Sequence, residues 1–390
     1  MLIKECTEHL QNTILPFWKR LIDTENGGYY GYMDKDLVVD KNAPKGVILN
    51  SRILWFFSNS YLTLNDKDDL KYARHAYEFL RDKCYDKEYG GVYWMMNADG
   101  SVNDDMKHTY NQAFAIYALA SYYDASGDEE ALNLAFSLFD TIEEKTLDEY
   151  GYMEAFTRDW KLADNDALSE NGIQAEKTMN AVLHLVEAYT ELLRVKRDKK
   201  VKQRLIWLLD CVKEKVYFEK EHRLLVFFDK KFNLLGDIHS YGHDIEAQWL
   251  TDRACEVLGD VKIKNEFEKI DLAISENIYK IAFDGEALNN ERDKTEINTN
   301  RIWWVQAETV VGFINAYQHS GDKKYLDAAL KTWEFIKNYL VDKREGGEWH
   351  WMIQKDHSTT DKPIVEPWKC PYHNGRMCFE VIKRGVDDER

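Results

Sequence analysis

Apolar residues recur at helical spacing along most of the chain. The segments DLKYARHAYEFLRDKCY (69–85) and KYLDAALKTWEFIKNYL (324–340) place them at i, i+3, i+4 and i+7, the pattern of an amphipathic helix. Similar segments with many exposed charges predict helices over 3–22, 68–85, 128–145, 197–216, 261–280 and 322–341. A second set, richer in Ala, Leu, Ile, Tyr and Trp, alternates with the first and predicts more deeply buried helices over 46–64, 108–126, 172–194, 243–259, 302–320 and 372–384.

A phrase of glycines and aromatic residues recurs between the two kinds of helix. It reads ENGGYYGYMD at 25–34, EYGGVYWMMNADG at 88–100, DEYGYMEAFTRDW at 148–160 and EGGEWHWMIQKD at 345–356, with weaker copies at 219–233 and 280–293. This spacing gives six repeats of about 65 residues. Twelve helices in six repeats predict an all-α fold, an (α/α)6 barrel that forms a single domain over 1–390. A one-sided superhelix is the alternative, but the end repeats lack polar caps, which favours closure.

The composition limits which classes of partner, and which cellular compartment, we expect for the protein. The chain of 390 residues has a formal net charge of −17, which repels phosphate backbones, so we expect no nucleic-acid partner. The six cysteines are scattered without a C-x-x-C pair, and the N-terminus lacks the apolar run of a signal peptide. No apolar stretch is long enough to span a membrane. These features predict a cytoplasmic protein, and no exposed apolar helix face calls for a dimer, so we expect a monomer.

Polar residues lie in the first two turns of nearly every buried helix, directly after the glycine loops. If these helices run parallel around a barrel, their side chains converge at one mouth and form a polar, aromatic pocket. Burying so many polar groups is costly unless they face water or a ligand. The set comprises Arg52, Tyr110, Gln112, Asn180, His184, His243, Glu246, Trp303, Trp304, Gln306, Glu308, His373 and Arg376.

Three other interpretations of these residues remain. Each histidine or tryptophan taken singly is often only a hydrogen-bonded core residue. His239, His243 and Glu246 have a spacing that suits zinc, but Gly242 places His239 outside the helix, so we expect no metal ion. Glycosidases use two carboxylates, and Glu246, Glu308 and Glu176 are the candidates. Glu246 lies one turn from His243 and is better placed to hold that histidine.

The two histidines suit proton transfer at a carbon atom. His243 and His373 lie on helices that are not neighbours in the ring, so they reach a ligand from different sides. Removing a proton next to a carbonyl and returning it on the opposite face is epimerisation, and histidine is the natural base near neutral pH. Arg52 is placed to stabilise an enediolate oxygen. The faces of Trp303, Trp304 and Trp368 are suited to stacking on a sugar ring.

These residues together carry a family resemblance. KGVILNSRILWFFSNSY, HTYNQAFAIYALA, KTMNAVLHLVEAY, SYGHDIEAQWLTD, RIWWVQAE and WKCPYHNGRMCFE resemble, in order, motifs of the N-acylglucosamine 2-epimerase superfamily, and most closely its members that act on cellobiose. The resemblance implies an (α/α)6 barrel without a metal or redox cofactor. It implies C2 epimerisation of the reducing-end glucose of cellobiose and related β-1,4-linked oligosaccharides, by ring opening and a cis-enediolate.

The resemblance also implies a role for each residue. His243 and His373 are the acid and base, Glu246 is the histidine partner and Arg52 binds the oxyanion. The residues around the sugar are Tyr110, Asn180, His184, Trp303, Trp304, Glu308 and Trp368. A monosaccharide enzyme of the same superfamily, either an N-acylglucosamine 2-epimerase or a mannose isomerase, is the first alternative. A glycan-binding barrel without activity, or a glycosidase, is the second.

Overall fold

The helices alternate between an inner and an outer ring. The structure, a computed structural model, describes residues 1–165 and 172–386. The inner ring consists of α3 (Val47–Leu64), α5 (Thr109–Ser126), α7 (Met179–Val195), α9 (Tyr241–Leu258), α11 (Trp303–Ser320) and α13 (Tyr372–Arg384). The outer ring consists of six helical rods, four of which contain a short π-helical segment labelled η. The rods are α1 (Leu2–His9) with η1 (Leu10–Ile14) and α2 (Leu15–Lys19), α4 (Lys67–Phe79) with η2 (Leu80–Cys84), α6 (Glu129–Lys145), α8 (Lys199–Cys211) with η3 (Val212–Val216), α10 (Val261–Ile281), and α12 (Lys323–Phe335) with η4 (Ile336–Leu340).

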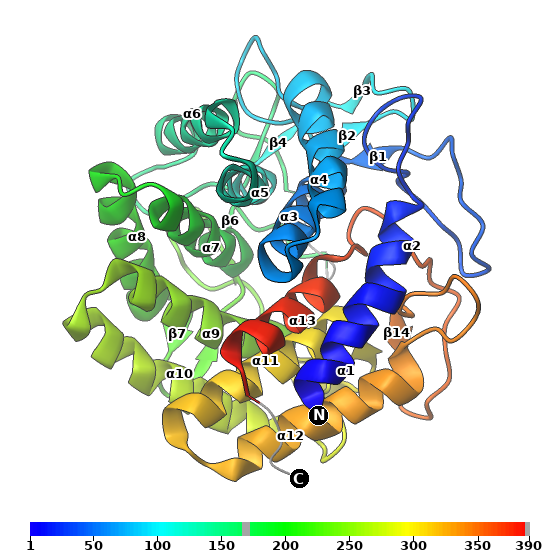
Figure 1. The fold of residues 1–390 in the computed structure, drawn as a ribbon. Coiled ribbons are helices and arrows are strands. Elements are labelled where there is room, and N and C mark those ends of the chain that lie inside the picture. The colour runs from blue at the N-terminus through cyan, green and yellow to red at the C-terminus, as the bar shows by residue number, and fades with distance from the viewer. Residues whose placement is uncertain (166–171, 387–390) are drawn as a thin grey trace.

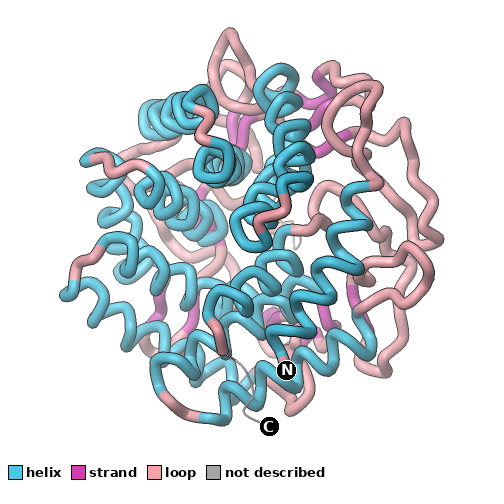
Figure 2. Tube along the Cα trace, in the orientation of Figure 1, coloured by secondary structure: helices cyan, strands magenta, loops and turns pink. Residues whose placement is uncertain are grey.

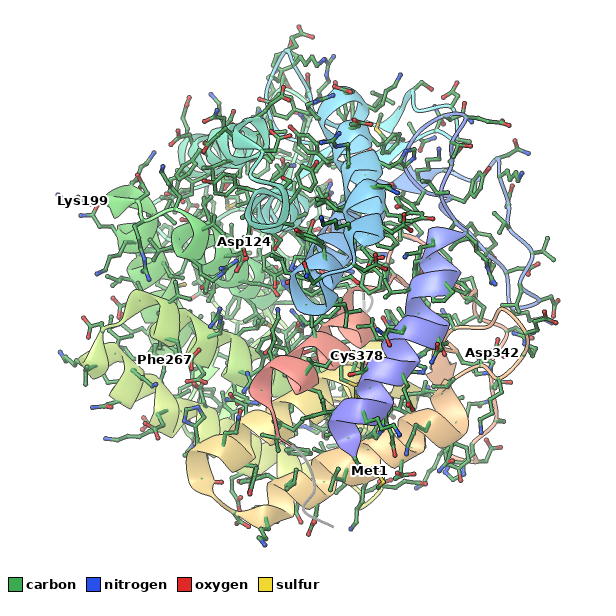
Figure 3. All side chains as sticks on the ribbon, viewed as in Figure 1. Met1, Asp124, Lys199, Phe267, Asp342 and Cys378 are labelled. Carbon is green, nitrogen blue, oxygen red and sulfur yellow. The ribbon has the colours of Figure 1, made fainter. Side chains whose placement is uncertain are left out.

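The inner helices form a closed ring (Figure 1). Each packs against the next along the chain, from α3 to α5, α7, α9, α11 and α13, and α13 packs back on α3. Each outer rod covers one inner helix, and α1 closes the outer layer by packing on α13. Figure 3 shows Cys378 on α13, the inner helix that α1 covers, and Lys199 at the rim of the molecule. The predicted (α/α)6 barrel of twelve helices is therefore confirmed, and the superhelix is excluded.

The inner helices are more buried than the outer ones, as their composition predicts. On α3, for example, every residue from Val47 to Ser60 is buried. The turn into the following outer helix is short and repeated. A left-handed residue such as Gly127, Gly259 or Gly321 ends the inner helix, and an aspartate caps the next helix by accepting backbone N–H bonds. Among the described helices, none is long and apolar enough to cross a membrane.

Short strands join the repeats on the side where the inner helices begin (Figure 2). They are β1 (Lys45–Gly46), β2 (Met95–Met96), β3 (Val102–Asp104), β4 (Lys107–His108), β5 (Ala155–Phe156), β6 (Lys177–Thr178), β7 (Tyr217–Phe218), β8 (Arg223–Leu224), β9 (Phe227–Phe228), β10 (Ile238–Ser240), β11 (Glu291–Asp293), β12 (Glu296–Asn298), β13 (Arg301–Ile302) and β14 (Met352–Ile353). The strand before an inner helix pairs antiparallel with the hairpin of the next repeat, as β1 does with β2, β4 with β5, β6 with β9, β10 with β11 and β13 with β14. A bridge between Met33 and Val365 links the first repeat to the last.

One predicted boundary is wrong by seven residues. The helix expected over 172–194 begins at Met179, because Lys177 and Thr178 pair with β9 and the Thr178 side chain caps the helix by accepting from the N–H of Ala181. The other boundaries agree within three residues.

Buried ion pairs fix the glycine loops to the inner helices. The ammonium of Lys45, just before α3, lies 2.6 Å from Asp23 and donates to the carbonyl of Gly27 at 2.8 Å. Lys107 repeats the arrangement before α5 with Asp86 at 3.0 Å. Lys369 and Glu348 form another fully buried pair, and Lys177 with Asp148 and Arg301 with Asp284 form similar pairs in which the cation is buried and the carboxylate is more exposed. Since a buried charge without its partner is strongly destabilising, these pairs hold the loops at the mouth in a fixed place.

Candidate active site

A cavity of about 260 Å³ lies at the mouth where the inner helices begin. All six inner helices contribute to its lining, together with the glycine loops. The structure brings ten of the eleven predicted site residues together there: Arg52, Tyr110, Asn180, His184, His243, Glu246, Trp303, Trp304, Trp368 and His373. The convergence follows from the parallel arrangement of the inner helices, because each residue lies near the same end of its helix.

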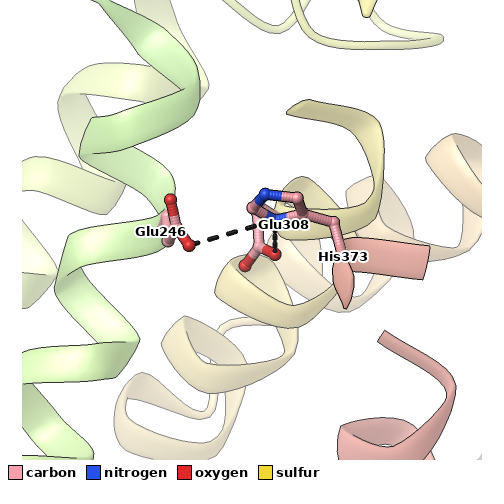
Figure 4. A group of neighbouring side chains, drawn as sticks. All are labelled: Glu246, Glu308 and His373. Atoms are coloured by element: carbon pink, nitrogen blue, oxygen red, sulfur yellow. Dashed lines mark hydrogen bonds and ion pairs between the residues drawn. The ribbon is translucent and has the colours of Figure 1, made fainter. Parts of the chain in front are cut away.

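Glu308 is the eleventh residue, and it does not line the cavity. It is fully buried beneath His373, and its Oε1 lies 2.7 Å from the Nδ1 of His373 (Figure 4). The Nη2 of Arg376 donates to the same oxygen at 2.6 Å, and the indole N–H of Trp249 donates to Oε2 at 3.0 Å. Glu308 thus lies where it can hold His373, and its contact with a sugar stays a prediction.

The partners of His373 define its protonation. An oxygen that accepts from Arg376 acts as an acceptor for Nδ1–H as well, so the hydrogen-bond network assigns the proton to Nδ1 and leaves a lone pair on Nε2. Burial lowers the pKa of His373 well below its ordinary value, although Glu246 opposes the shift. Burial also raises the pKa of Glu308, against the charge of Arg376. His373 is therefore neutral at neutral pH and can accept a proton.

Arg376 collects three carboxylates from three inner helices. Its Nη2 bonds Glu246 of α9 and Glu308 of α11, and its Nη1 bonds Glu187 of α7. All four side chains are at least 96% buried. Charge-assisted bonds of this kind compensate for removing the ions from water. The guanidinium therefore ties three walls of the barrel together directly below the cavity.

A second histidine has the same arrangement as His373. The Nδ1 of His184 lies 2.9 Å from Oε2 of Glu187, whose other oxygen accepts bonds from Arg376 and from the hydroxyl of Tyr372. Burial lowers the pKa of His184 well below its ordinary value. A continuous chain of contacts thus runs from His184 through Glu187, Arg376 and Glu308 to His373.

His243 differs from the prediction in its partner. Its Nδ1 lies 2.7 Å from Oγ of Ser240, whereas the carboxylate of Glu246 bonds Arg376 and lies 4.0 Å from the Nδ1 of His373. The expected pairing of His243 with Glu246 is therefore corrected. The i, i+3 spacing brings Glu246 to the right turn, but the guanidinium attracts the carboxylate more strongly than an imidazole does.

Trp304 contacts both of the predicted acid–base histidines. Its ring centroid lies 4.8 Å from that of His243 and 5.4 Å from that of His373. Gly242 makes this packing possible, since a Cβ there would lie 2.5 Å from the edge of the indole. The two imidazoles thus face one cavity from α9 and α13, next to a shared aromatic surface.

Unpaired polar atoms point to a polar ligand. Among the described residues, the Nε of Arg52, the Oδ1 of Asn180 and the Nε1 of Trp303 are buried without a hydrogen-bond partner, and all three residues line the cavity. Leaving such atoms unpaired is costly, so a ligand that bonds them gains affinity. Arg52 is anchored by Nη2, which donates to the Tyr110 hydroxyl at 2.7 Å, and by stacking of its guanidinium on Phe114.

Among the described residues, His239, His243 and Glu246 do not form a group of potential metal ligands. His239 lies apart from the predicted site, with its Nε2 2.6 Å from Asp244. A group of potential ligand atoms does occur in the described part of the chain, where atoms of Glu246, Glu308 and His373 lie within 4.8 Å of one another. Arg376 already bonds both of these carboxylates, so the positive charge at this position belongs to a guanidinium.

Three important residues were missing from the predicted site: Glu187 and Tyr372 in the buried network, and Trp351 in the aromatic wall of the cavity. Arg376 was among the polar residues expected at the mouth but was assigned no role. Glu187 has a signal in the sequence, because it follows His184 by three residues on a helix. Arg376 also lies one turn after His373.

The closed helical barrel with histidines, an arginine and tryptophans at its mouth defines the class. The chain belongs to the N-acylglucosamine 2-epimerase family, whose model matches residues 27–375. It is 62% identical to the cellobiose 2-epimerase of Ruminococcus albus over 388 residues, which cover 99% of this chain and 100% of that protein. A crystal structure of a sugar epimerase from a ruminal bacterium superposes with a TM-score of 0.99 at 61% identity over 100% of both chains. The cellobiose 2-epimerase of Bacillus thermoamylovorans B4167 gives a TM-score of 0.94 at 44% identity, over 98% of this chain and 99% of that one.

Proposed function

We propose that the chain is a cellobiose 2-epimerase. The cavity is the observation that carries the proposal, because it presents a neutral His373 and His243 to one ligand with Trp304 against both rings. Membership of the family and 62% identity to a cellobiose 2-epimerase over the whole chain support the substrate. The reaction inverts C2 of the reducing-end glucose, so cellobiose gives glucosyl-mannose and lactose gives epilactose.

Each residue of the cavity has its own proposed role in the C2 epimerisation. In the open-chain sugar, one of His243 and His373 removes the proton from C2, which lies next to the C1 carbonyl. The other histidine returns a proton to the opposite face, and Arg52 stabilises the oxygen of the cis-enediolate between the two steps. Glu308 stabilises the imidazolium of His373 when it forms. Trp303, Trp304 and Trp368 provide apolar faces for the sugar rings, and Asn180 offers its unpaired oxygen to a hydroxyl.

We also propose a domain organisation, a cellular compartment and an oligomeric state for the protein. Residues 1–390 form one catalytic domain, which the packing of α13 on α3 and of α1 on α13 supports. The protein acts in the cytoplasm as a monomer, and the net charge of −17 argues against a nucleic-acid partner. Glu246 orients the acid–base pair through Arg376 and His373.

One experiment tests the function directly. The protein is incubated with cellobiose in D2O, and the sugars are followed by proton NMR. We expect a mannose-type reducing end with deuterium at C2, since a histidine exchanges the abstracted proton with solvent. A ketose as the main product would assign the chain to the isomerases, and free glucose would assign it to the glycosidases. Binding without turnover would make it a glycan-binding barrel.

A further inference from the structure

Ser240 lies just before α9, at a position where a serine normally caps a helix. It is the N-cap residue and its backbone is extended, yet its side chain makes no capping bond to the first turn. Thr178 holds the same position before α7 and does cap its helix, because its hydroxyl accepts from the N–H of Ala181 at 3.0 Å. A missing cap lowers the stability of a helix, so the different use of the Ser240 hydroxyl needs a reason.

The hydroxyl of Ser240 bonds the side chain of His243 instead. Its Oγ lies 2.7 Å from the Nδ1 of His243, and both residues line the cavity. Ser240 is only 8% exposed, so water competes little for this bond. Because the serine engages Nδ1, proton transfer between His243 and a sugar passes through Nε2.

The surrounding elements fix both partners of this bond. Ser240 is the last residue of β10 and pairs with β11, and the N–H of the following residue, Tyr241, donates to the carbonyl of Asn290 at 3.2 Å. The imidazole of His243 packs against Trp304 of α11, with 4.8 Å between the ring centroids. A hydroxyl on a paired strand and an indole on a neighbouring helix therefore hold the orientation of the ring.

The two acid–base histidines differ in the partner of Nδ1. His373 has the carboxylate of Glu308, which accepts, whereas His243 has a hydroxyl, which can donate or accept. A donating hydroxyl would place the proton of a neutral His243 on Nε2, and that tautomer cannot take a proton from C2. An accepting hydroxyl places the proton on Nδ1 and leaves the Nε2 lone pair to act as the base. The same orientation stabilises the imidazolium, in which both nitrogen atoms carry a hydrogen.

We propose that Ser240 is the positioning residue of His243, and that its hydroxyl accepts the Nδ1–H bond and so selects the tautomer that can act as a base at C2. This inference rests on the proposed function, because it concerns the acid–base pair of that reaction. It also explains why the N-cap hydroxyl of α9 is turned away from the helix, whereas that of α7 is not.

Long-range 1H–15N NMR of the imidazole nitrogen atoms measures the tautomer in the protein without substrate. The signals of His243 are those that disappear in His243→Ala. We expect neutral His243 of the wild type to carry its proton on Nδ1. In Ser240→Ala the tautomer should shift to Nε2–H, and the pKa of His243 should fall because the imidazolium loses an acceptor. Ser240→Thr keeps the hydroxyl and should restore the wild-type behaviour.

Two features of the chain make this comparison specific to Ser240. Ser320→Ala is the matched control, since Ser320 lies at the far end of α11, where its hydroxyl donates to the carbonyl of Ala316, and it should change neither the tautomer nor kcat. All other titratable side chains of the cavity are retained in the serine variants, so a change in the titration of His243 is due to Ser240. They are Arg52, Tyr110, His184, Glu246, Glu291 and His373.

The kinetics on cellobiose show whether the bond serves the reaction. In Ser240→Ala the tautomer that acts as a base has an N–H without its acceptor, so kcat should fall about 5- to 100-fold, and Ser240→Thr should recover most of it. The Tm should change little in either variant, because this hydroxyl caps no helix.

Three results would overturn the inference. They are a wild-type His243 with its proton on Nε2, a Ser240→Ala variant with the wild-type tautomer, and a Ser240→Ala variant with the wild-type kcat. A wild type that has the expected tautomer but does not epimerise cellobiose would refute the proposed function instead, and would leave the Ser240–His243 bond confirmed.

Discussion

Replacing Glu308 with glutamine tests whether this residue acts on the sugar or on His373. Glutamine preserves the shape of the side chain and an oxygen that can accept the Nδ1–H of His373, but it removes the negative charge. The bond between Glu308 and His373 is 2.7 Å long and fully buried, so it is little screened by solvent. The charge matters most while His373 carries a proton, because a neutral imidazole gains less from it than an imidazolium does.

The size of the effect follows from the strength of this bond. Hydrogen bonds to charged groups contribute roughly 1.5–3 kcal/mol, and neutral ones about 1 kcal/mol. Glu308→Gln therefore removes about 0.5–2 kcal/mol of stabilisation from the state with a protonated His373. At about 1.4 kcal/mol for each factor of ten, kcat should fall roughly 2- to 30-fold. The KM for cellobiose should change little, because Glu308 does not line the cavity.

Steady-state kinetics on cellobiose, with a thermal unfolding curve to confirm folding, measure the outcome. The matched control is Glu143→Gln on the outer helix α6, where a buried carboxylate also accepts from two tyrosines, Tyr152 and Tyr189, and pairs with Arg204. It should retain the wild-type kcat even if stability falls. A large rise in KM at constant kcat in Glu308→Gln would show that Glu308 binds sugar and would refute the positioning role.

Three further predictions follow from the same geometry. His243→Ala and His373→Ala should each lower turnover by about 1,000-fold or more with an unchanged circular dichroism spectrum, and substantial activity in either variant would remove that histidine from the mechanism. Gly242→Ala should displace the Trp304 indole and lower kcat/KM as Trp304→Ala does, because the new Cβ would lie 2.5 Å from the ring; wild-type kinetics would contradict the packing argument. Burial raises the pKa of Glu154 to about 7 from 4.5, so its contribution to stability is full below about pH 4.5 and is lost as the pH rises through 7. Glu154→Gln should therefore gain stability relative to the wild type, by up to about 3 kcal/mol between pH 5 and 8 in urea unfolding, and a difference that does not vary with pH would refute the shift.

The helices were predictable because their periodicity is local. An amphipathic segment such as 324–340 shows its buried face within a few turns, and the repeated glycine loops give the number of repeats. The short strands were not predicted, because pairs of two or three residues gain stability only from a partner in the next repeat. Lys177 and Thr178 illustrate this, since their pairing with β9 delays the start of α7 to Met179.

The position of the site was predictable for a similar reason, whereas its contacts were not. Every inner helix begins at the mouth, so the polar residues on its inward face reach the cavity or its floor. Gln112 and Gln306, which were expected there too, instead bond the backbone of Val92 and Leu288 in the loops. Distances between helices depend on packing that the sequence does not express locally. Thus Glu308 shares the phase of the residues that line the cavity but lies one layer below them, where it bonds His373.

The i, i+3 rule gave a correct geometry on one helix and a misleading one on another. His184 and Glu187 on α7 form a hydrogen bond at that spacing, whereas Glu246, at the same spacing from His243 on α9, bonds Arg376. The difference lies in the charge balance of the floor. A buried guanidinium must be compensated, and it draws one carboxylate from each of three neighbouring helices. Burial raises the pKa of Glu187 and of Glu308, and the charge of Arg376 opposes this shift, so the guanidinium keeps carboxylate charge available below the cavity. In the proposed mechanism this charge stabilises a transient imidazolium of His373, whereas burial keeps the resting imidazole neutral. The network would then supply both a base that is unprotonated at neutral pH and a counter-charge for the protonated state.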